Sequence, residues 1–234
     1  MARDPDQIEL AGDPPVSLRI RRSARARRLS LSVSRLDGRV TLTLPARVAL
    51  KGAMAFVQER RGWIDKALEG AVAPVLVAPG ALLPVEGRML TVQAAPVRSA
   101  RIEGGALLVP AARPGPAALA FLRALARQRL AARVAVHAAA LGRTAGALTL
   151  RDTRSRWGSC TATGDLMFNW RLILAPPEVL DYVAAHEVAH LAQMNHSPAF
   201  WAEVARLFPG HLAARRWLKT QGTALHRYRF APEA

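Results

Sequence analysis

The sequence contains a single cysteine, few acidic residues and no long uninterrupted apolar run. Because one cysteine, Cys160, cannot form an intrachain disulfide, we expect a reducing compartment, the cytoplasm. The first fifteen residues lack the basic and apolar regions of a secretory signal peptide. The most apolar stretch, residues 73–85, contains three prolines and is too short to cross a bilayer. These absences predict a soluble cytoplasmic protein with no membrane association, and nothing in the sequence specifies an oligomeric state.

Acidic residues are also scarce relative to basic ones, since 17 Asp and Glu stand against 33 Lys and Arg and give a formal net charge of +16. Such an excess attracts polyanions. Two basic segments stand out: Arg19, Arg21, Arg22, Arg25, Arg27 and Arg28, and then Arg215, Arg216, Lys219, Arg227 and Arg229. They either contact phosphates or form solvated faces of ordinary elements. No zinc-finger, helix-turn-helix or RNA-binding signature indicates sequence-specific recognition.

Hydrophobic residues make up 51% of the 234 residues, which is enough for a sizeable core. Residues 1–15 are acidic and proline-containing, and we expect a disordered tail there. Residues 16–110 show strand-like alternation on both sides of Asp37-Gly38 and again at 89–92 and 106–109, with one helix at 50–68. The pattern predicts a β-rich N-terminal region with one helix, without an internal repeat.

Proline and glycine at residues 110–116 are typical of a linker, after which residues 117–234 are expected to form a second, mainly helical domain with a small sheet. Its predicted helices cover residues 117–141, 178–194, 198–208 and 212–223, and its predicted strands cover 147–150 and 166–170. The fold class is therefore α+β.

The expected helix 178–194 contains the sequence His186-Glu187-Val188-Ala189-His190, which is an HExxH pattern. Residues four apart lie one above the other on a helix, so both imidazoles can bind one zinc ion. Glu187 is then expected to take a proton from the water that the metal activates, and to pass it to the leaving group. The residues on both sides of the HExxH pattern are largely apolar, which indicates a buried helix. Histidines buried there would need partners, and a metal ion is one.

A catalytic zinc ion needs a third protein ligand and one open position. We expect His196 as the third ligand, because a turn before Ser197-Pro198 can bring it back towards the helix. Glu203, from the following helix, is the alternative. His211 and His226 are interpreted as surface residues.

Several motifs resemble those of the YgjP-type bacterial metallopeptidase family, which is related to the SprT-like zinc proteases. The motifs are RSRWGSC at residues 154–160, FNWRL at 168–172, APP at 175–177, HEVAH at 186–190 and NHSPAFW at 195–201. The expected β-hairpin from Arg25 to Pro45, around Asp37-Gly38, and Trp63-Ile64 also look like that family. The resemblance implies a zincin-like catalytic domain that binds zinc through His186, His190 and His196, with Glu187 as the base. SprT-like relatives include proteases that act on proteins crosslinked to DNA, which would give the positive charge a purpose.

The segment Arg156-Trp157-Gly158-Ser159 is a candidate substrate-binding element. An edge strand beside the zinc could pair with an extended polypeptide, and Gly158 would allow close backbone approach. Trp157 is equally well interpreted as a core aromatic residue. An oxyanion could be stabilised by Arg156, Tyr182 or Tyr228, and the sequence does not choose among them. Cys160 is either a small buried residue or a thiol near the zinc.

Three functions are consistent with these observations. A zinc metallopeptidase that hydrolyses polypeptide substrates, in part on DNA-associated proteins, agrees best with the motif. A basic nucleic-acid-associated protein with a non-catalytic zinc site is the second, and Glu187 argues against it because a structural site needs no base. A zinc hydrolase acting on a non-peptide bond is the third.

Overall fold

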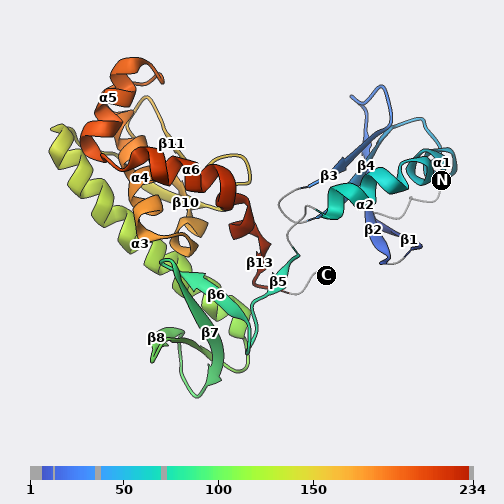
Figure 1. Cartoon of the computed structure of the whole chain (residues 1–234), viewed down its shortest axis with the longest axis horizontal. Helices are drawn as coiled ribbons and strands as arrows, with labels where there is room; N and C mark the ends of the chain where they lie inside the picture. Colours follow the sequence, from blue (N-terminus) through green and yellow to red (C-terminus); the bar gives the residue numbers. More distant parts are fainter. Residues whose placement is uncertain (1–6, 13, 35–37, 70–72, 232–234) are drawn as a thin grey trace. The chain divides into compact units, whose positions relative to one another are not determined.

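The computed structural model describes residues 7–12, 14–34, 38–69 and 73–231 of the 234-residue chain. The chain divides into two compact units, Met1–Pro74 and Val75–Ala234 (Figure 1). The second unit holds all the candidate site residues.

The first unit is a four-stranded sheet with two helices against one face. Its elements are β1 (Gln7–Leu10), β2 (Val16–Ser23), β3 (Ser30–Val33), β4 (Val40–Pro45), α1 (Leu50–Glu59) and α2 (Arg61–Glu69). The strand order is β1-β2-β4-β3, with β2 parallel to β4 and the other two pairs antiparallel. Leu18 and Leu42 from the sheet share one apolar core with Val57 and Ile64 from the helices.

Two details of this unit differ from the expectations. Residues 7–10 form β1, paired with β2, because burial of Leu10 in the core stabilises the pairing. The expected disordered tail is therefore wrong for these residues, while residues 1–6 and 13 lie outside the described ones. The single helix expected at 50–68 is two helices, since the backbone leaves helical geometry at Arg60 (φ −98°, ψ 8°). The predicted pairing on either side of Asp37-Gly38 is confirmed as β3 and β4, with the turn residues 35–37 outside the described part.

The second unit begins with a short strand and a four-stranded sheet. These elements are β5 (Val75–Leu76), β6 (Leu82–Val85), β7 (Arg88–Ala95), β8 (Arg101–Glu103) and β9 (Ala106–Pro110). The order β6-β7-β9-β8 has the same strand directions as the first sheet, a repetition of topology that the sequence does not reveal. Val92 and Val109 pack into the same core as Leu122 of the next helix, so this sheet belongs with the elements that follow it. The boundary between the units thus falls at 74–75 and not at the expected linker, 110–116.

The elements that carry the candidate site residues follow. They are α3 (Pro114–Leu141), β10 (Leu148–Arg151), β11 (Gly158–Cys160), β12 (Leu166–Asn169), the 3-10 helix η1 (Trp170–Leu174), α4 (Pro177–Ala189), α5 (Pro198–Leu207), α6 (His211–Gln221), the 3-10 helix η2 (Gly222–Arg227) and β13 (Tyr228–Arg229). The long helix α3 and the helix α4 pack together and carry much of the core (Figure 1).

Two small sheets position the ends of these elements. In the order β10-β12-β11, β10 is parallel and β11 antiparallel to the central β12, so β11 is an edge strand close to α4. Near the C-terminus, β13 pairs in parallel with β5. Among the described residues, no helix combines the length and the apolar character that a membrane crossing needs.

Candidate metal centre and active site

The helix α4 places the two histidines of the HExxH pattern next to each other. It begins at Pro177, whose fixed φ suits the first helical position, and Glu178 in the first turn complements the helix dipole. His186 and His190 are one turn apart, and their ring centroids are 5.2 Å apart. Both rings therefore lie on the same side of the helix, as the four-residue spacing predicts.

A turn after α4 brings the third histidine to the other two. The helix ends at Ala189 and not near residue 194, because the next amides bond three residues back: Leu191 to Val188 and Ala192 to Ala189. The turn ends at Ser197, whose side chain accepts a hydrogen bond from the Phe200 amide and begins α5. The Nε2 atoms of His196 and His186 are consequently 3.2 Å apart.

The three imidazoles together form a donor set that fits a metal ion. One ring nitrogen from each of His186, His190 and His196 lies within 4.8 Å of the others. Two nitrogens bound to tetrahedral zinc at 2.0–2.1 Å are separated by about 3.3 Å, close to the Nε2 separation in this site. Three imidazoles with one open side are the ligand set of many catalytic zinc sites.

The alternative ligand, Glu203, is not part of this group. Its carboxylate accepts hydrogen bonds at 3.0 and 2.8 Å from Arg206 on the same helix. The structure thus brings His196, and not Glu203, together with the HExxH histidines.

The histidines are held in orientations and protonation states that favour metal binding. His190 Nδ1 is 3.0 Å from the carbonyl oxygen of Gln193, so an Nδ1–H donates there and Nε2 keeps its lone pair. Burial, and then the neighbouring His190, His196 and Arg215, lower the pKa of His186 to about 3. Burial also lowers the pKa of His190, against the hydrogen bond to Gln193. Both rings are therefore neutral at neutral pH, which a metal ligand requires.

Phe200 on α5 is a contributor that the sequence analysis did not single out. Its ring stacks on His190 at 4.4 Å between centroids and lies edge-on to His186 at 4.9 Å and to His196 at 4.8 Å. The Phe200 side chain is fully buried. It fixes the positions of all three imidazoles. The sequence feature that could have identified Phe200 is its position, three residues after the helix-capping Ser197.

Glu187 is buried beside the histidines. It is only 5% exposed, and burial raises its pKa to about 8, against the positive charge of Arg156. The backbone of Gly158 on β11 is so close that a Cβ there would lie 2.5 Å from Oε1. The edge strand and the carboxylate are thus in direct contact, which only glycine at position 158 permits.

An open pocket of about 320 Å³ contains this arrangement. It is lined by Arg156, Gly158, Ser159, Cys160, His186, Glu187, His190, Met194 and His196. Three of the four candidate substrate-binding residues, Arg156, Gly158 and Ser159, therefore line it.

The fourth candidate, Trp157, faces elsewhere. It is half-buried, and its ring lies 5.3 Å from that of His226. The interpretation of His226 as a surface residue is wrong, since the contact with Trp157 leaves it only 5% exposed. Cys160 is half-buried at the pocket, and burial, with Glu187 and Asp165 nearby, raises the pKa of its thiol, so it stays protonated.

The structure also distinguishes among the three candidates for stabilising an oxyanion. Tyr182 is 5% exposed and packs edge-on against His186, while Tyr228 is 7% exposed in β13. Neither lines the pocket, whereas Arg156 does.

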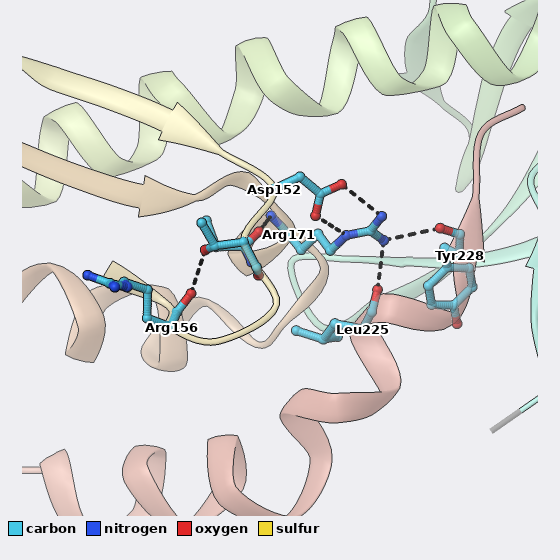
Figure 2. Close-up of polar contacts among 7 residues, drawn as sticks. Asp152, Arg156, Arg171, Leu225 and Tyr228 are labelled. Atoms are coloured by element: carbon cyan, nitrogen blue, oxygen red, sulfur yellow. Dashed lines mark hydrogen bonds and ion pairs between the residues drawn. The ribbon is translucent and has the colours of Figure 1, made fainter. Parts of the chain in front are cut away.

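A polar network supports the loop from β10 to β11, which carries Arg156. The Thr153 hydroxyl donates to the Arg156 carbonyl oxygen at 2.7 Å, and the Asn169 side chain donates to the Thr153 carbonyl oxygen at 2.6 Å. Arg171 donates to both carboxylate oxygens of Asp152, at 2.7 and 3.0 Å. Figure 2 shows the Arg156 side chain extending away from this network.

Comparisons with known proteins identify the family of the chain. A family model for the YgjP-like metallopeptidase domain matches residues 27–221, most of the chain. No curated protein matches. Among solved structures, the crystal structure of the metallopeptidase zymogen of Pyrococcus abyssi abylysin is similar, with 23% sequence identity and a TM-score of 0.36 over 39% of this chain and 95% of that one. A likeness at this TM-score supports no further conclusion.

Proposed function

Because the chain belongs to the YgjP-like metallopeptidase family, we propose that it hydrolyses peptide bonds with one zinc ion and with Glu187 as general base. His186, His190 and His196 would hold the zinc. The observation that carries the proposal is the convergence of these histidines and Glu187 in one open pocket beside the edge strand β11. A structural zinc site would have a closed fourth position and no buried carboxylate next to it.

Glu187 has the properties of a proton carrier in this reaction. When bound, zinc would supply Lewis acidity that activates water and polarises the scissile carbonyl. The buried Glu187 would accept the proton of that water and deliver it to the amine that leaves. Burial alone raises the pKa of Glu187, and the positive charge of a bound zinc ion would lower it, so that the ionised carboxylate could accept the proton.

The edge strand β11 would hold the substrate in an extended conformation. One side of its backbone pairs with β12, and no strand among the described residues pairs with the other side. An extended polypeptide added there would run past the histidines, and side chains of alternate residues would point into the pocket. Gly158 would let the peptide backbone approach Glu187 closely.

Arg156 would contact the carbonyl oxygen on which negative charge develops. Of the three candidates it alone lines the pocket, and its charge acts on Glu187. A guanidinium at that position stabilises the transition state more than the ground state, which is the condition for faster catalysis.

The substrates would include polypeptides associated with DNA. A net charge of +16 favours contact with phosphates, and the exposed arginines Arg25, Arg27 and Arg28 lie together between β2 and β3. A nucleic-acid-associated protein with a non-catalytic zinc site is the rival function, and it shares this surface.

Cleavage of an unfolded protein substrate by the zinc-loaded protein tests the proposal. Glu187→Gln should retain zinc and lose at least about a hundredfold in kcat, since general-base catalysis contributes that much or more. Glu203→Gln is the matched control, because it makes the same change in the surface pair with Arg206. Undiminished cleavage by Glu187→Gln, or no cleavage by the zinc-loaded wild type, would sink the peptidase proposal.

A further inference from the structure

The segment Gly222–Arg229 lies beyond the residues that the family model matches, yet it contacts the residues that lead into the active-site strand. It comprises η2 and β13. Two of its contacts with these residues involve the side chains of Arg171 and Trp157.

Arg171 joins this segment to the loop between β10 and β11. It is 6% exposed, and Nη1 donates to the carbonyl oxygens of Leu225 at 3.0 Å and Tyr228 at 3.1 Å. Its other donors hold both carboxylate oxygens of Asp152, the first residue of the loop (Figure 2). One buried guanidinium thus fixes the loop and the C-terminal segment to each other.

Trp157 forms the second connection, at the other end of the same loop. Its ring lies 5.3 Å from that of His226, and a Cβ at Gly222 would lie 3.0 Å from its Cζ2 atom. Its carbonyl oxygen accepts a hydrogen bond from the Asn169 amide at 2.8 Å. The next residue is Gly158, against which Glu187 packs, so a shift of Trp157 would move β11 relative to the carboxylate.

We propose that Gly222–Arg229 is a positioning element of the peptidase site. By holding Asp152 and Trp157, it sets the place of Arg156 and of β11 relative to Glu187. This inference rests on the proposed function, because the positions it fixes are those of the substrate and the general base. A displacement of about 1 Å at such positions can lower a rate about a hundredfold.

Arg171→Lys tests the first connection, since lysine keeps the charge but cannot reach Asp152 and both carbonyl oxygens together. Zinc-loaded Arg171→Lys should have a kcat/KM at least about tenfold below the wild type. The matched control is Arg61→Lys, because Arg61 likewise pairs with one aspartate, Asp65, and donates to two distant carbonyl oxygens, those of Ala11 and Pro14, all within the first unit. The control should stay within about twofold of the wild type.

Hydrogen exchange of residues 152–160 gives a second readout, which does not depend on peptidase activity. Exchange there should be faster in Arg171→Lys and unchanged in Arg61→Lys. A wild type that cleaves nothing would overturn the proposed function, whereas the exchange result would still show whether the Gly222–Arg229 segment holds residues 152–160 in place. Unchanged exchange in residues 152–160 would overturn the positioning role.

His226 provides variants that leave Arg171 intact, in case Arg171→Lys loosens the whole unit. His226→Ala removes the ring from Trp157 and should lower kcat/KM and speed exchange in residues 152–160. His226→Phe keeps a ring there and should restore both. Equal effects of the two substitutions would contradict the positioning role.

Discussion

Gly158 and Glu187 are in contact because position 158 has no side chain: a Cβ there would lie 2.5 Å from Oε1 and 2.6 Å from Cγ of Glu187. The glycine is on the edge strand β11 and the glutamate is on α4, 29 positions later in the chain. Their contact joins the strand that would bind substrate to the group that would carry the proton.

Substituting Gly158 tests this contact. Gly158→Ala should displace the carboxylate or the strand, lower kcat at least about tenfold, and cost about 1–3 kcal/mol of stability through overpacking. Kinetics with zinc-loaded protein and thermal unfolding measure the two effects. Gly62→Ala is the control: it lies in α2 with nothing within 4 Å of an added Cβ, and should be neutral or slightly stabilising. Full activity in Gly158→Ala would contradict the contact.

The metal ligands can be distinguished by zinc affinity. His196→Ala should weaken zinc binding strongly, because it removes one of three imidazoles whose nitrogens lie within 4.8 Å of one another. Glu203→Ala should bind zinc like the wild type, since that carboxylate pairs with Arg206. Competition with a chelator of known affinity measures both. A loss of zinc in Glu203→Ala alone would instead identify that residue as the third ligand.

The stability should depend on pH through His226. Burial, with Arg171, Arg154 and Arg229 around it and against Asp152, lowers the pKa of His226 to about 4 in the folded protein. In the unfolded chain its pKa is about 6.5. The neutral ring therefore contributes stability that is complete above pH 6.5 and is lost as the pH falls towards 4, by about 3 kcal/mol.

His226→Phe removes this titration and keeps a ring. Relative to the wild type, the variant should become more stable as the pH falls from 6.5 to 4. Denaturant unfolding across that range measures the difference. A difference between the two proteins that does not change with pH would show that His226 titrates normally in the fold.

Binding to DNA should be salt-dependent and should involve the arginines between β2 and β3. Replacing Arg25, Arg27 and Arg28 with alanine should weaken DNA retention and make the dependence of log K on log salt less steep, by about 0.9 for each phosphate that the variant no longer neutralises. The variant Arg88→Ala, Arg98→Ala, Arg143→Ala removes the same charge from dispersed exposed positions of the second unit and is the control. Equal weakening in both would mean that net charge alone attracts DNA.

The sequence by itself determined the parts of this protein that depend on local spacing. The four-residue interval between His186 and His190 places both rings on one side of any helix. Pro177 begins a helix through its fixed φ, and Ser197 begins one through a side chain that caps the helix. The alternation of apolar and polar residues on either side of Asp37-Gly38 predicted the β3–β4 pair, which also depends on local spacing. These features arise from interactions between residues a few positions apart, so the sequence alone is enough to predict them.

The tertiary structure decided what depends on residues far apart in the chain. The boundary between the units follows from the packing of β7 and β9 with α3, and composition at residues 110–116 does not report it. Burial of His226 requires Trp157, 69 positions earlier, and Arg171 finds its acceptors at Asp152 and in the C-terminal segment. Even Gly158 shows its role only when α4 packs beside β11. Such contacts need the chain to close long loops, so the amino-acid order near each residue carries no sign of them.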